Sequence, residues 1–347
     1  MSDNRAAARC ADRVRVSRRS RGTVSDNRAA ARRADPARGS RTSQGTVSDN
    51  RSALSRRKAT AGRMFIAPNL IAVAVFMAFP LGFTLYLSLH RWDLFGSPEF
   101  IGIGNFRRLF AHDPLFWVAL RNTVIFTVGT LIPTIVIGLA VAAALNRKLK
   151  GIGIFRSIMF MPLVASTVAM AVVWRLTFST DYGVLNTVLG WVGIGPVPWL
   201  TDPGWSMVSL CLVSVWKSVP FVTVVLLAAM QGIPADVYEA ARIDGAGALR
   251  RFGAITVPLI RPALAFAFVI TVINSFQVFD QAYVLTGGKG GPETGTYVLG
   301  IMLYQNAFSF DDIGYACALA WVIFAILLAL TLLQLRFTRG NAYESEA

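Results

Sequence analysis

The sequence predicts an all-α membrane protein in which six transmembrane helices follow a polar N-terminal tail. Composition is the first indication, since 54% of the 347 residues are hydrophobic and 15% are charged, whereas soluble domains average about 25% charged residues. The second is the presence of six apolar stretches that can each cross a bilayer core of about 30 Å, which takes roughly 20 helical residues. The third is the tail at 1–63, which holds 17 Lys or Arg against 5 Asp or Glu.

The basic charge belongs to this tail and not to the predicted membrane domain. Of the net charge of +15, residues 1–63 contribute +12 and the rest of the chain contributes +3. The tail also repeats itself, because SDNR occurs three times at a spacing of 23 residues. Low hydrophobicity with high charge predicts disorder, so we expect a cytoplasmic basic arm and no nucleic-acid partner. Val24 and Val47 align with Met1 in the repeat, so all three are candidate starts of the natural protein.

Cysteine and histidine residues are too sparse to suggest a metal site or a disulfide framework. The three cysteines lie far apart in the chain, with no CxxC pair. The two histidines, His90 and His112, fall in one predicted loop without other candidate ligands. We therefore expect no bound metal.

The six predicted spans follow one another in chain order. The first, within 64–90, is too long for the core of a signal peptide and follows a long polar segment, so we expect it to be retained as a membrane helix. The other five form a predicted membrane domain at 118–337. The predicted spans are 65–89, 119–145, 155–178, 206–230, 262–285 and 314–337.

The charges of the loops predict the orientation of the chain. Basic residues gather after the second, fourth and sixth spans, whereas the loop at 179–205 has no Lys or Arg and the loop after the fifth span has one, Lys289. Loops rich in Lys and Arg stay in the cytoplasm. We therefore expect a multi-pass protein of the plasma (inner) membrane with both termini in the cytoplasm.

A polar segment at 234–262 interrupts the apolar chain on the predicted cytoplasmic side. Pro234 and Asp236 suit the first turn of a helix, and Gly245 with Gly247 suits its end, because glycine readily takes the left-handed conformation. A second short helix should then run until it is stopped before Pro258. Small residues at the turn would let another protein approach closely, but an ordinary solvated loop has the same composition.

The segment contains the pattern EAA-x-x-DGA-x5-F-x-x-I-x-x-P-x3-P. This pattern resembles the EAA loop of binding-protein-dependent ABC import permeases, and the surrounding chain from about 119 to 337 resembles the carbohydrate-uptake type. The resemblance implies a type I ABC importer permease fold, with a cytoplasmic coupling helix that docks on an ATPase. It implies coupling roles for Glu239, Ala240, Ala241, Asp244, Gly245, Ala246 and Pro258.

The resemblance also implies a set of partners. They are a cytosolic ABC ATPase dimer, a second homologous permease subunit that makes a heterodimer, an extracytoplasmic solute-binding protein and the lipid bilayer. The chain lacks the phosphate-binding pattern G-x4-G-K-[ST], so we expect ATP and Mg to bind the ATPase and this subunit to be no enzyme by itself.

Polar residues in the fourth and fifth spans are candidates for a substrate pathway. On a continuous helix, Asn274, Gln277 and Gln281 fall within about 60° of one another, with Asp280 beside them. Such groups face protein or water and not lipid, so they either line a pathway or bond to another helix. Lys217, in the middle of the fourth span, has either a pathway role or a structural role at the Pro220 kink. Trp174 is a packing residue or a substrate contact.

The function that follows is uptake of a sugar or sugar-derived solute by an ATP-driven importer. The same machinery could carry a non-sugar solute. A different class, a secondary transporter driven by an ion gradient, would keep its uptake without an ATPase and would have no need of the 234–262 segment.

Overall fold

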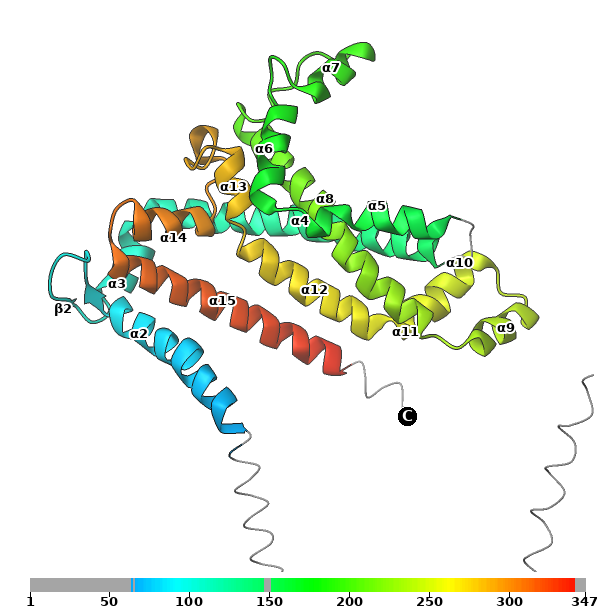
Figure 1. Cartoon of the computed structure of the whole chain (residues 1–347), viewed down its shortest axis with the longest axis horizontal. Helices are drawn as coiled ribbons and strands as arrows, with labels where there is room; N and C mark the ends of the chain where they lie inside the picture. Colours follow the sequence, from blue (N-terminus) through cyan, green and yellow to red (C-terminus); the bar gives the residue numbers. More distant parts are fainter. Residues whose placement is uncertain (1–63, 65, 147–150, 341–347) are drawn as a thin grey trace, which may run out of the picture. The chain divides into compact units, whose positions relative to one another are not determined.

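The computed structural model of the protein describes residue 64 and residues 66–146 and 151–340. The described chain is mostly helical (Figure 1). It divides into two units, Met1–Ile71 and Ala72–Ala347, and the account below concerns the second. The predicted disordered tail lies outside the described residues.

Four helices are long and apolar enough to cross a membrane, and they match the first, second, fourth and sixth predicted spans. They are Ile66–Ser88, Pro114–Leu145, Pro203–Gln231 and Ile313–Gln334. The first of them ends with α2 (Phe79–Ser88), the next two are α4 and α8, and the last begins α15 (Ile313–Gly340). Both α4 and α8 begin with proline after an aspartate: Asp113 accepts from the Leu115 amide at 2.9 Å, and Asp202 accepts from the Gly204 and Trp205 amides. An N-cap carboxylate followed by proline starts a helix firmly.

The third predicted span, 155–178, is not one straight helix. It consists of α5 (Ile152–Val164) and α6 (Thr167–Thr177), which meet at an angle of 99°. The physical reason is that Ala165 and Ser166 take extended backbone, with ψ of 140° and 128°.

The fifth predicted span, 262–285, is wrong in its extent. The helix α12 (Arg261–Phe276) ends nine residues before the predicted limit, and a separate short helix, α13 (Asp280–Leu285), follows. At its other end α12 meets the preceding helical segment, Ala248–Leu259, at 69°. Six spans are present when each bent pair counts as one.

The helices α4 and α8 pack against each other at the centre of this unit, and α12 packs on both. Gly138 permits the close approach, since a β-carbon there would lie 2.7 Å from Val222 Cγ1. Small residues allow membrane helices to come close in this way. The helix α15 packs against α2, α12 and α14 (Leu299–Phe308).

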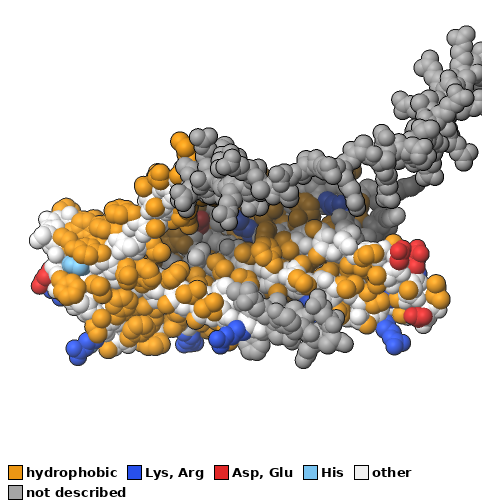
Figure 2. Space-filling model, turned by 90° about the horizontal axis from the view of Figure 1, so that it is seen from below, with side chains coloured by type: hydrophobic (Ala, Val, Ile, Leu, Met, Phe, Trp, Pro, Cys, Tyr) orange, Lys and Arg blue, Asp and Glu red, His pale blue; other side chains and the backbone are white. Residues whose placement is uncertain are grey.

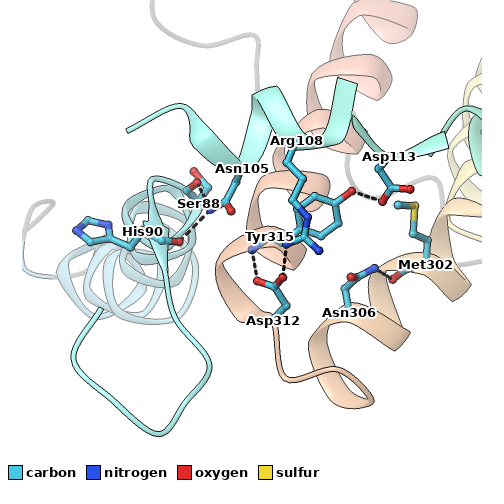
Figure 3. A network of polar contacts seen from close by, with 9 residues as sticks. All are labelled: Ser88, His90, Asn105, Arg108, Asp113, Met302, Asn306, Asp312 and Tyr315. Atoms are coloured by element: carbon cyan, nitrogen blue, oxygen red, sulfur yellow. Dashed lines mark hydrogen bonds and ion pairs between the residues drawn. The ribbon is translucent and has the colours of Figure 1, made fainter. Parts of the chain in front are cut away.

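One end of the unit is closed by a polar network, which we call the end cap (Figure 3). It joins α2 to a hairpin of β1 (His90–Arg91) and β2 (Glu99–Phe100), to α3 (Gly104–Arg107), and to the start of α15. The Asn105 amide donates to the carbonyls of Ser88 and His90, at 2.9 Å each. Arg108 pairs with Asp312 at 2.6 Å and lies over the Tyr315 ring, whose hydroxyl donates to Asp113, the N-cap of α4.

Hydrophobic side chains cover most of the described surface in Figure 2. Many belong to the outer faces of the long helices, as with Phe76 at 77% and Val136 at 60% exposed. A soluble protein rarely exposes so continuous an apolar surface, whereas lipid accepts it without cost. The protein is therefore a multi-pass membrane protein.

We predict that Gly314→Ala loosens the end cap. A β-carbon at Gly314 would lie 2.0 Å from the His90 carbonyl oxygen, and backbone cannot move aside as a side chain does. We expect a loss of about 1–3 kcal/mol of stability, seen as a lower midpoint of thermal unfolding in detergent. The matched control is Gly82→Ala in α2, where nothing lies within 4 Å of the added carbon. Equal midpoints for the two variants would contradict the close approach.

Candidate functional site

The segment at 234–262 forms a helical hairpin at the end of the unit away from the end cap (Figure 1). Its first limb is α9 (Ala235–Ile243), with Asp236 in the first turn. Gly245 then takes a left-handed conformation, with φ of +74°. The Ala246 amide donates to the Ala241 carbonyl at 2.9 Å and the Gly245 amide to the Arg242 carbonyl at 3.1 Å. These bonds close the helix as the sequence predicts, because glycine takes the left-handed turn easily.

The second limb returns toward the bundle and holds the first in place. It runs through α10 (Ala248–Arg251), a π-helical turn at Phe252–Thr256 and α11 (Val257–Leu259). Arg251 Nη1 donates to the Ala246 carbonyl at 2.7 Å, and the hydroxyls of Tyr238 and Thr256 bond at 2.9 Å. The turn is therefore braced by contacts from both limbs.

The sequence predicts that the second helix stops before Pro258, but the structure shows no stop there. The widened π-helical turn precedes it, and Pro258 opens α11, where the missing N–H is not required. Helical backbone continues to Leu259, and the chain turns at Ile260 instead. Pro258 thus lies on the return limb and not at the tip of the hairpin.

The tip of the hairpin offers small residues between two large apolar ones. Glu239, Ala240, Asp244 and Gly245 are exposed, Ala246 is half-buried and Ala241 is buried. Ile243 and Leu249, which the sequence reasoning missed, are 87% and 88% exposed on either side of the glycine turn. The available signal was the placement of two large aliphatic residues within a run of Ala and Gly. Exposed aliphatic side chains around small residues make a surface that suits another protein. We call residues 234–247 with Leu249 the docking tip.

A cavity of about 580 Å³ lies between α8 and two places where the chain leaves helical geometry. Its walls come from the α5–α6 break, the middle of α8, and the link from α12 to α13. The lining residues are Leu163, Thr167, Lys217, Ser218, Phe221, Ile270, Thr271, Asn274, Gln277, Val278, Phe279, Asp280 and Gln281. We call it the central cavity. It brings together Lys217 and all four polar residues predicted on the fifth span.

These residues do not lie together because they share one face of a continuous helix, as the sequence predicts. The chain leaves helical geometry after Phe276, and Phe279 has φ of −139° and ψ of −66°. Asn274 therefore belongs to α12, while Asp280 and Gln281 open α13. The angular argument for a continuous helix fails, and the break itself turns both helix ends toward the cavity. Interrupted helices of this kind form binding sites in transporters, because their freed backbone groups line protein or water.

The central cavity presents both hydrogen-bond donors and acceptors. The Lys217 ammonium donates to the Thr167 hydroxyl across the gap between α8 and α6. The Gln281 Oε1 is buried and has no hydrogen-bond partner among the described residues. Phe279 lies in an aromatic group with Tyr283 and Tyr304, with centroids 5.2 and 4.9 Å away. Amides, one ammonium, one carboxylate and aromatic faces suit a ligand with many hydroxyls.

Trp174 lies away from the lining of the central cavity. Its ring stacks on Phe178 at 5.2 Å and meets Trp216 edge to face at 5.6 Å. Of the two roles that the sequence leaves open, this geometry favours packing.

The segment from α13 to α14 is fixed against α4. Asn122 donates to the carbonyls of Thr294 and Tyr297, and the Leu299 amide donates to the Thr123 hydroxyl at 3.0 Å. Burial, together with the charge of Asp113, raises the pKa of Tyr297 to about 12. The phenol therefore stays protonated and donates to Gln305 Oε1 at 2.8 Å. These bonds anchor the chain that follows α13, the helix that carries Asp280 and Gln281.

In the part of the chain that the structure describes, no cluster of His, Cys, Asp and Glu has the arrangement of a metal site. The polar groups of the central cavity are mainly amides and hydroxyls, which hold ligands by hydrogen bonds.

Sequence comparison finds a matching family and many relatives. The profile of the family described as "binding-protein-dependent transport system inner membrane component" matches residues 114–340. The trehalose/maltose transport system permease protein of Thermococcus litoralis is 37% identical over 285 residues, which is 82% of this chain and 95% of the relative. The lactose transport system permease protein of Rhizobium radiobacter is 38% identical over 277 residues, covering 79% and 92%.

Structural comparison finds a solved protein chain with the same fold as this one. A chain from the crystal structure of a bacterial ABC transporter that imports the acidic polysaccharide alginate superposes with a TM-score of 0.71. The match covers 83% of this chain and 98% of the other, at 24% identity.

We predict that the Tyr238–Thr256 bond braces the docking tip. Tyr238→Phe or Thr256→Val removes one hydrogen bond, worth about 1 kcal/mol, so amide exchange in α9 should speed up about fivefold. The measurement is hydrogen exchange read by mass spectrometry on the purified protein. The double variant should exchange no faster than either single one, since the bond is lost once. Tyr182→Phe, at a tyrosine that is 73% exposed, is the control; unchanged exchange in both single variants would contradict the brace.

Proposed function

Because this chain belongs to the family of binding-protein-dependent transport system inner membrane components, we propose that it is the permease subunit of an ATP-driven importer for a sugar or sugar-derived solute. The named relatives are permeases for trehalose/maltose, for lactose and for arabinooligosaccharides, the last 31% identical over 283 residues. The central cavity supports this cargo, since its amides and aromatic rings match hydroxyl groups and sugar faces.

The observation that supports the proposal most is the connection, within this chain, of the hairpin to the central cavity. The helix α12 begins at the 69° bend that ends the hairpin and finishes at Phe276, beside the central cavity. Since an α-helix is stiff along its axis, a displacement of the docking tip is passed to Asn274 and Gln277. The proposed coupling residues are Glu239, Ala240, Ala241, Asp244, Gly245 and Ala246, with Pro258 supporting them from the return limb.

The proposed transporter complex includes three partner proteins. A cytosolic ABC ATPase dimer binds ATP and Mg and receives the docking tip, so this subunit performs no catalysis. A second homologous permease subunit closes the cavity, which is supported by the exposure of Asn274, Gln277 and Asp280 in the single chain. A solute-binding protein outside the membrane delivers the substrate to the pathway of Asn274, Gln277, Asp280, Gln281 and Lys217. Trp174, proposed for that pathway on sequence alone, supports its wall by packing.

The proposed orientation puts the docking tip and both termini in the cytoplasm. The hairpin carries Arg242, Arg250 and Arg251, and positive charge is retained on the cytoplasmic side. The end cap then faces outward, toward the solute-binding protein.

We predict that Glu239→Lys or Gly245→Asp abolishes ATP-dependent uptake while the protein stays in the membrane. Reversing or adding a charge at a contact that is buried between two proteins weakens their binding free energy by about 2 kcal/mol or more. Uptake should therefore fall at least about thirtyfold. The measurement is uptake of labelled sugar by cells or proteoliposomes that contain the whole transporter, with membrane levels followed by immunoblot.

Gly253→Asp is the matched control, because Gly253 is an exposed glycine of the return limb with nothing within 4 Å of an added β-carbon. Wild-type uptake in both docking-tip variants would refute the coupling role. Uptake that persists without ATP and collapses when the ion gradient is dissipated would instead identify a secondary transporter.

A further inference from the structure

The charges of the central cavity are balanced. Among its described lining residues there is one cation, Lys217, and one anion, Asp280. They come from different elements, the middle of α8 and the first turn of α13, which pack against each other. The remaining polar side chains of the lining are neutral amides and hydroxyls.

The two charges share the cavity without forming a direct ion pair. In the described part of the chain, the ion pairs are Arg91–Glu99 and Arg108–Asp312, both at the end cap. Lys217 donates to the Thr167 hydroxyl instead. Both charges therefore keep hydrogen-bonding capacity for a ligand that lies between them.

We propose that Lys217 and Asp280 act as a compensating pair that makes the central cavity selective for an uncharged polyhydroxylated solute. This inference rests on the proposed function and deepens it, since it names the charge class of the sugar. The pair supplies a strong donor and a strong acceptor to solute hydroxyls, and the cavity as a whole stays neutral. The buried Gln281 Oε1, which has no hydrogen-bond partner within the described part of the chain, adds an acceptor for a further hydroxyl.

Electrostatics gives the reason for the selectivity. An isolated charge inside a membrane protein is expensive unless an opposite charge compensates it. A carboxylated sugar that paired with Lys217 would leave Asp280 uncompensated and would be repelled by it. A sugar with an ammonium group meets the reverse problem at Lys217. A neutral sugar disturbs neither charge.

The test uses the whole transporter, with the ATPase, the second permease subunit and the solute-binding protein, in liposomes loaded with ATP. The solute-binding protein is first titrated with neutral sugars (maltose, trehalose, lactose) and with anionic ones (galacturonate and alginate oligomers). Uptake is then measured for each sugar that binds. We expect the transported sugar to be uncharged.

The second arm removes the charges and keeps the hydrogen-bonding groups. Lys217→Gln and Asp280→Asn should each lower uptake about tenfold, because each leaves the other charge alone. The double variant Lys217→Gln/Asp280→Asn restores neutrality, so its uptake should return to within about threefold of wild type. Arg175→Gln, at an exposed charge of α6 outside the cavity lining, is the control for charge removal.

The outcomes separate this inference from the proposed function. A double variant as poor as the worse single variant, or wild-type uptake of an anionic sugar in preference to neutral ones, would overturn the inference alone. Absence of ATP-driven uptake of any sugar by the wild-type complex would overturn the proposed function and this inference with it. Membrane yield and ATP hydrolysis stimulated by the binding protein show whether each variant is assembled, and Lys217→Arg, which keeps the charge, should transport better than Lys217→Gln.

Discussion

Backbone hydrogen bonding in lipid is the constraint on which the rest of this structure depends. Amide and carbonyl groups that leave a helix within the bilayer find no water there, so an interrupted helix is tolerated only where protein or a cavity surrounds it. The chain leaves helical geometry at 165–166, between α5 and α6, and at 277–279, directly after α12. Both interruptions face the central cavity, and the polar side chains that gather there are the ones that lipid excludes.

The fold connects this cavity to the docking tip through α12 and the return limb of the hairpin. The two ends of α12 are the bend at Ile260 and the break after Phe276, and α4, α8 and α15 pack along its length. The end cap holds the opposite end of the unit with Arg108–Asp312 and with the bond from Tyr315 to Asp113. Charged contacts thus hold the end cap, while the docking tip presents exposed aliphatic residues. This arrangement suits a movement of the docking tip relative to the end cap.

Much of this architecture could be predicted from residue patterns. The spans came from hydropathy, and the hairpin with its left-handed glycine came from turn chemistry at Gly245. Other predictions failed because they treated each segment alone. A helical wheel assumes a continuous helix and so does not predict the break at Phe279. The pattern also predicts a helix stop before Pro258, whereas a π-helical turn accommodates this proline. The sequence pattern does not single out Ile243 and Leu249, since exposure is a property of the assembled fold.

The sequence by itself determined that this chain enters a membrane several times, that a polar hairpin interrupts it, and that its family carries solutes. These properties depend on local composition and spacing, which a linear pattern records. The tertiary structure decided which polar residues share a cavity, and it separated Trp174 from them. Lys217, Thr167 and Asp280 lie far apart in sequence, and only the packing of α6, α8 and α13 determines their proximity. Long-range packing of this kind has no signature in the order of residues along one segment.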